Sequence, residues 1–144
     1  MNGRAKIPAT SPRQPARRGA TAVEFAFVAP VFFVLVLAII EFGRAMMVQS
    51  LLVGAAEQGA RAGAMANATA SDVSTSVNSY LTSGGVAGAS TTVAPSPPSS
   101  ALSGQSITVT VTVPYSSVSW LPSPSYLKTK TLTGSAIVQR ETGQ

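Results

Sequence analysis

The residues of this chain that could do acid–base or metal chemistry are few and scattered. The sequence has five acidic residues, no cysteine and no histidine. Metal sites of thiolate or imidazole, Cys-His and Ser-His-Asp nucleophile systems and disulfide scaffolds are therefore excluded. Glu57, Asp72 and Glu141 stand apart, without an accompanying base, acidic cluster or phosphate-binding loop. Lone carboxylates of this kind are usually solvated or cap helices, so we expect no catalytic residue, no metal and no cofactor.

Glu24 is the acidic residue whose position indicates a function. It lies beside Phe25, where the basic stretch ending in Arg17 and Arg18 meets a strongly apolar segment. A carboxylate near the centre of a membrane costs about 2.5–3.5 kcal/mol on insertion scales, so acidic residues in such segments tend to be functional. We therefore expect Glu24 to have a function that offsets the cost of placing it in a membrane helix.

The apolar segment is long enough to cross a membrane. Residues 25–40 carry no charge and are bracketed by Glu24 and Glu41. At about 1.5 Å per residue they span about 24 Å, and including residues 20–23 extends this to about 31 Å, enough for a hydrocarbon core. The apolar run is longer than that of an ordinary cleaved signal, and no small-x-small site follows it closely. We therefore expect a transmembrane helix at 20–42.

Charge asymmetry predicts the orientation of this helix. Half of the ten basic residues and none of the acids precede the apolar segment, and basic residues are retained on the cytoplasmic side of a membrane. The N-terminus is thus expected inside and residues after Glu41 outside. A basic tail without interleaved aromatic residues or a folded reading element does not indicate nucleic-acid binding. The basic residues of this leader are Arg4, Lys6, Arg13, Arg17 and Arg18.

The helix is predicted to continue beyond the membrane, over 43–66, as one rod from about Ala20 to Ala66. Met47, Leu51 and Ala55 fall on one stripe at helical spacing, which predicts a packing partner. Gly59 and Gly63 stand four residues apart and form a small face that another backbone could approach closely. The alternative is a generic helix rich in alanine and glycine. Pro30 lies inside the helix and could kink it.

Residues 67–144 are expected to form one small exterior α+β domain. Val73, Val77, Tyr80 and Leu81 predict a short amphipathic helix, capped by Ser71 or Asp72 and ending at Gly84-Gly85. Strict alternation over 106–113 predicts a strand that ends at Pro114. Residues 130–140 are predicted to form a partner strand with Gly134 as a possible bulge, and residues 91–94 a further short strand. The intervening loop, 115–127, carries Trp120, Pro122, Pro124 and Tyr126; its rings either cover the sheet, the simpler interpretation, or form a contact surface.

The N-terminal motif resembles that of the TadE-like family of pseudopilins. The resemblance covers Arg-Arg-Gly-Ala-Thr-Ala-Val-Glu-Phe at 17–25, the apolar helix, the Glu-Phe-Gly-Arg exit at 41–44 and the small-residue extension that ends in Arg-Ala-Gly-Ala at 61–64. It is weaker over the exterior domain, where the strand around 131–136 resembles the closing segment of the family. These proteins belong to tight-adherence (Flp) pilus systems, which are related to type IV pili and type II secretion.

The resemblance implies a fold and a maturation step. The fold is α+β and pilin-like: a long N-terminal transmembrane helix with an extension, then a small antiparallel sheet. A prepilin peptidase of the inner membrane would remove the leader, 1–19, by cutting between Gly19 and Ala20. Glu24, with the aromatic Phe25 that the family usually shows beside it, would then pair with a free α-amino group during assembly.

The resemblance also implies a role and partners. The chain would be a minor pseudopilin, single-pass in the inner membrane, that acts with other pilins and pilus assembly proteins in adhesion or secretion. Its exterior part is longer than that of the very short major Flp pilins. No small-molecule substrate and no nucleic acid is expected. The alternative is an uncleaved bitopic membrane protein whose exterior domain binds a wall, a glycan or another partner.

Overall fold

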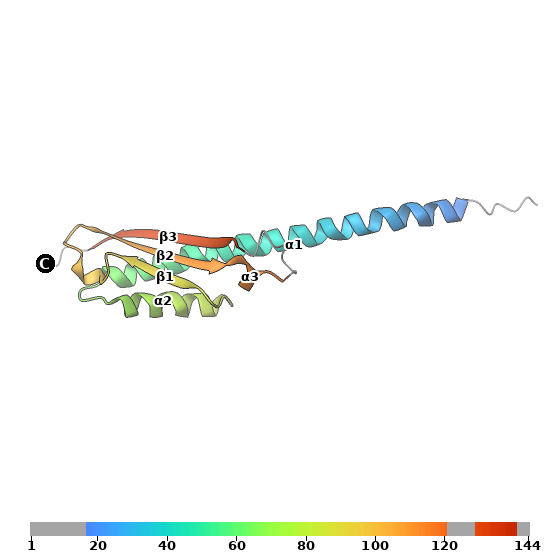
Figure 1. The fold of residues 1–144 in the computed structure, drawn as a ribbon. Helices are drawn as coiled ribbons and strands as arrows, with labels where there is room; N and C mark the ends of the chain where they lie inside the picture. Colours follow the sequence, from blue (N-terminus) through green and yellow to red (C-terminus); the bar gives the residue numbers. More distant parts are fainter. Residues whose placement is uncertain (1–16, 121–128, 141–144) are drawn as a thin grey trace, which may run out of the picture. The chain divides into compact units, whose positions relative to one another are not determined.

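The computed structural model describes residues 17–120 and 129–140, and the chain falls into two units, Met1–Ala38 and Ile39–Gln144. We call the second unit the C-terminal domain. The fold is mixed α+β, a long apolar N-terminal helix followed by a small antiparallel sheet, as the sequence predicts (Figure 1). Residues 1–16 and the greater part of the aromatic loop, 115–127, lie outside the described residues. The elements are α1 (Arg17–Ala64), α2 (Ala70–Ser83), β1 (Ser90–Ala94), the 3-10 helix η1 (Pro98–Ser100), β2 (Ser106–Pro114), α3 (Tyr115–Val118) and β3 (Thr131–Gln139).

Helix α1 is continuous over 48 residues and contains Pro30. Its extent agrees with the predicted rod to within three residues at either end. The helix ends where Asn67, three residues beyond Ala64, adopts a positive φ of 60°, a conformation that asparagine tolerates better than most residues. The C-terminal domain begins within this helix, at Ile39, so the last turns of α1 are part of its core.

Helix α2 begins with a capping box. The Thr69 hydroxyl accepts a hydrogen bond from the Asp72 backbone N–H, and the Asp72 carboxylate accepts one from the Thr69 backbone N–H at 2.9 Å. The predicted cap at Ser71 or Asp72 was therefore wrong: Asp72 completes the box from the third helical position. The hydrogen bonds from the Thr69 hydroxyl and backbone lower the pKa of Asp72 below its ordinary value of 3.8. The predicted apolar face is confirmed, with Val73, Val77 and Leu81 buried.

The three strands form one antiparallel sheet in the order β1-β2-β3. Strand β2 lies in the centre, and its alternating pattern places all four branched aliphatic side chains on a fully buried face. The predicted bulge at Gly134 is wrong, because β2 and β3 pair without interruption from Ser106↔Gln139 to Pro114↔Thr131. The buried side chains of β2 are Ile107, Val109, Val111 and Val113.

Helices α1 and α2 share the buried face of the sheet. Val73 and Val77 of α2 meet Val109 of β2 around Gly59. The predicted stripe on α1 is confirmed only in part: Ala55 is buried, whereas Met47 is 51% exposed and Leu51 half-buried. The buried stripe of α1 is wider than the predicted one. Its buried members are Val48, Leu52, Ala55, Ala56 and Ala60.

Candidate functional site

The apolar part of α1 exposes its side chains along its whole length. Phe25 is 70% and Phe27 76% exposed, and none of the most apolar stretch is buried within the chain. By length and composition, α1 is the one helix among the described residues that can cross a membrane. Burying its exposed side chains away from water is strongly favourable, at about 1.5–3 kcal/mol for each large aliphatic or aromatic one. One long apolar helix of this kind near the N-terminus favours a single-pass membrane protein.

The predicted processing and assembly residues lie together at the start of α1. Gly19, Ala20, Glu24 and Phe25 are all exposed and helical. A side chain added at Gly19 would meet nothing within 4 Å, so this structure gives no packing reason for a glycine there. Ala20 and Glu24 are separated by one helical turn, which places them on the same face of the helix.

A second group of side chains gathers where the apolar segment ends. The Tyr115 hydroxyl donates a hydrogen bond to Glu41 Oε1 at 2.9 Å, and the Ser119 side chain also hydrogen-bonds the Glu41 carboxylate. Arg44 donates from Nε to the Val118 carbonyl, and its guanidinium carbon lies 4.6 Å from the centre of the Trp120 ring. We call Glu41, Arg44, Tyr115, Ser119 and Trp120 the exit cluster.

Sequence reasoning missed the exit cluster, although the spacing of its two charged residues was visible in the sequence. Glu41 and Arg44 stand three residues apart, a spacing that places opposite charges side by side on a helix. Their partners come from α3 and the two residues after it, about 74 positions along the chain. Trp120 is 73% exposed, so its ring contributes little to covering the sheet, and the buried residue of this segment is Val118. Pro122, Pro124 and Tyr126 lie outside the described residues.

The sequence of α1 carries a family signature. The family model for TadE-like proteins matches residues 19–61, from the predicted processing site through the apolar segment to the small-residue face. These residues are a TadE-like segment. No curated protein and no solved structure matches the chain. The family match implies involvement in tight-adherence (Flp) pilus systems.

The last turns of the TadE-like segment pack within their own chain. An added methyl at Gly59 would lie 2.6 Å from a methyl of Val77, and at Gly63 3.2 Å from a methyl of Val73. The neighbours of both glycines are side chains of α2, β2 and η1, not the backbone of a second helix. Close backbone approach occurs instead at Gly134 of β3, where an added methyl would lie 2.5 Å from the Leu52 carbonyl oxygen.

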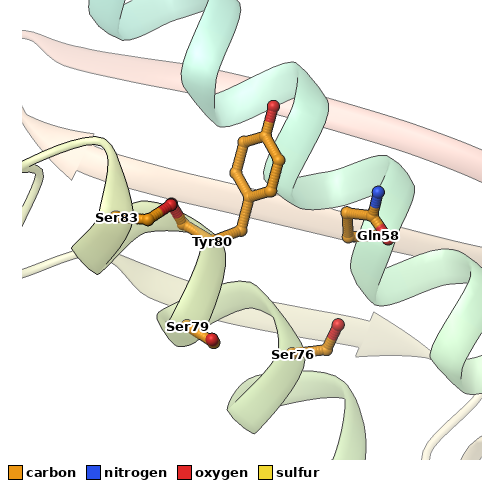
Figure 2. A pocket seen from close by; sticks show the side chains of 5 residues that line it. All are labelled: Gln58, Ser76, Ser79, Tyr80 and Ser83. Carbon is orange, nitrogen blue, oxygen red and sulfur yellow. The ribbon is translucent and has the colours of Figure 1, made fainter.

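Two hollows on the C-terminal domain lie beside Tyr80. Figure 2 shows one between α1 and α2, where the Tyr80 ring points towards α1, the labelled serines also lie on α2, and Gln58 lies on α1. A neighbouring hollow beyond Tyr80 includes one carboxylate, Glu57. Among residues 17–120 and 129–140, no three potential metal ligands of the acidic, histidine or cysteine type gather. The first hollow is lined by Gln58, Ser76, Ser79, Tyr80 and Ser83.

Proposed function

We propose that this chain is a minor pseudopilin of a tight-adherence (Flp, type IV-like) pilus or a related secretion system. In this proposal, prepilin peptidase matures it and it acts in pilus assembly. The observation that carries the proposal is the family match, which begins at Gly19 and includes Glu24 and the whole apolar segment. Residues 1–18 precede the match, and the proposed basic leader, 1–19, ends at the first matched residue. The proposed partners are the inner membrane, prepilin peptidase, other pilins and pilus assembly proteins.

The proposed cut lies between Gly19 and Ala20, in the first turns of α1. A peptidase that binds its substrate in extended form must unwind this part of the helix. Unwinding there costs little, because the first N–H groups of a helix have no intrahelical partners and helix ends fray. Gly19 lowers the cost further, since glycine stabilises a helix about 1 kcal/mol less than alanine does.

Cleavage would give Glu24 a partner that the uncut chain lacks. The new α-amino group on Ala20 would lie one turn from the Glu24 carboxylate and on the same face of α1. A carboxylate in an apolar environment is tolerable when a cation pairs with it, and such a pair between neighbouring helices also fixes their register. We propose that Glu24 pairs with an Ala20 amine, its own or that of a neighbouring subunit.

The basic leader sets the proposed orientation, with the N-terminus in the cytoplasm and the C-terminal domain outside. A folded C-terminal domain that packs the last turns of α1 into its core gives the helix a rigid outer end. We propose that this domain supplies lateral contacts during assembly. The competing function is an uncleaved bitopic protein, in which the bond between Gly19 and Ala20 stays intact.

Processing tests the proposal through a matched pair of glycines. Gly19 and Gly43 both lie on α1 with open space around them. Gly19→Leu should block the size decrease that an active prepilin peptidase causes, because a bulky side chain cannot enter a narrow cleft, whereas Gly43→Leu should be processed as the wild type is. Immunoblots of cells with and without the peptidase measure this. Normal processing of Gly19→Leu would refute the assigned cut.

A further inference from the structure

The exit cluster lies where α1 leaves its apolar segment, and none of its contacts serves the maturation step. We propose that the face of the C-terminal domain carrying the exit cluster rests in the lipid headgroup layer of the membrane, with Trp120 as its anchor. The inference rests on α1 crossing the membrane, which is part of the proposed function, and it holds for either orientation. The occupant of this face is the lipid surface itself.

The depth of the cluster follows from helix geometry. Ala20 and Glu41 are 21 residues apart, or about 31 Å along a helix that rises about 1.5 Å per residue, which matches a hydrocarbon core of about 30 Å. Glu41 and Arg44 therefore fall at the boundary between acyl chains and headgroups. Tyr115 and Trp120 contact these two side chains directly, so they share that depth.

The types of the side chains fit this boundary. Tryptophan and tyrosine are enriched at membrane–water interfaces, because their rings are apolar and their N–H or O–H groups need polar partners. Trp120 is 73% exposed and Phe42, next to Glu41, is 68% exposed. The outward face of β2, in contrast, carries hydroxyl residues: Thr108, Thr110 and Thr112. The domain thus exposes large aromatic side chains beside the end of the apolar segment.

The charges of the cluster are compatible with a position against lipid. Glu41 accepts hydrogen bonds from Tyr115 and Ser119, and Arg44 donates one to the Val118 carbonyl. Arg44 also covers one face of the Trp120 ring, an arrangement that strengthens when water is withdrawn. Glu41 and Arg44 carry opposite charges, so these two side chains balance each other within the cluster.

The single tryptophan of the chain makes the inference measurable. The full chain is reconstituted at high dilution into vesicles of phosphatidylethanolamine and phosphatidylglycerol, with bromine atoms either near the glycerol end or near the methyl end of the acyl chains. We expect Trp120 fluorescence to be blue-shifted, mostly quenched by the shallow bromines, weakly quenched by the deep ones and protected from aqueous iodide. Strong quenching by iodide with none by bromolipids would overturn the inference, as would stronger quenching by the deep bromines.

A relocated tryptophan supplies the matched control. In a Trp120→Phe background, Ile137→Trp places the ring at an exposed position of β3, where 66% of the present side chain is accessible. This ring should be quenched by iodide and not by bromolipids; equal bromolipid quenching at both positions would overturn the inference. Extraction at alkaline pH separates the two proposals. If the chain leaves the vesicles, membrane crossing fails and both proposals fall. If the chain stays and Trp120 remains aqueous, only the inference falls.

Discussion

Gly134 offers the sharpest test of how α1 meets the sheet. A methyl group there would lie 2.5 Å from the Leu52 carbonyl oxygen and from the Val53 nitrogen, whereas ordinary contacts of this kind begin at 3.4 Å. These are backbone atoms of a helix whose Leu52 side chain is fully buried, so no rotamer change relieves the overlap. Gly134→Ala must therefore push α1 away from β3 by about 1 Å. In a close-packed core a displacement of this size lowers the stability of the fold.

The cost follows from overpacking and backbone entropy. Overpacking a core costs about 1–3 kcal/mol, and the upper end applies to Gly134→Ala because the helix backbone itself must move. Replacing glycine by alanine returns about 0.4–1 kcal/mol by restricting the unfolded chain. We expect the free energy of unfolding of the C-terminal domain to fall by about 2 kcal/mol. With a urea dependence of about 1–2 kcal/mol per molar, the unfolding midpoint should drop by about 1–2 M.

The assay is pulse proteolysis of the full chain in detergent micelles across a series of urea concentrations, with Gly54→Ala as the control. At Gly54 an added methyl would lie 2.6 Å from the Tyr80 hydroxyl, the tip of a side chain that can move, and the helix gains about 1 kcal/mol from alanine. Its midpoint should stay close to that of the wild type. A wild-type midpoint for Gly134→Ala would refute the close contact between α1 and β3.

Two further predictions concern single carboxylates. Glu24→Gln should leave membrane insertion and processing intact but reduce the amount of pili in sheared surface fractions. The control Glu57→Gln, on an exposed part of α1, should leave the amount of pili unchanged. Wild-type pilus levels with Glu24→Gln would contradict the proposed pairing. The pKa of Asp72 is lowered in the folded state, so its stabilising contribution is present above the unfolded pKa of about 3.9 and is lost as the pH falls through the lower folded value. Asp72→Asn should therefore lose less stability than the wild type in urea titrations as the pH falls below about 5. An unchanged pH profile would argue against the hydrogen bonds from Thr69.

Local patterns made the elements of this fold predictable. The alternation over 106–113 predicts β2 because the side chains of a strand point to opposite faces in turn, and Val73, Val77 and Leu81 recur at helical spacing on α2. The apolar segment of α1 was predictable from its length and lack of charge alone. In each case the signal lies within a few neighbouring residues.

Contacts between distant segments were not predictable in the same way. Gly134 suggested a bulge from its strand alone, and only the position of α1 shows that a passing backbone is the reason for the glycine. On α1 the core takes Val48 and Leu52 in place of the neighbouring Met47 and Leu51, while Ala55 is buried as predicted. The partners of Glu41 and Arg44 follow β2 in the sequence, and no pattern in the residues around Glu41 or Arg44 indicates them.

The central claim is maturation between Gly19 and Ala20, and the N-terminal residue of the native protein tests it most directly. The chain is purified from membranes of cells that express the cognate prepilin peptidase, and its N-terminus is determined by sequencing and intact mass. The account predicts a start at Ala20, which makes Glu24 the fifth residue of the mature chain. A start at Met1, while the same peptidase cleaves another substrate in those cells, would contradict it and leave an uncleaved membrane anchor.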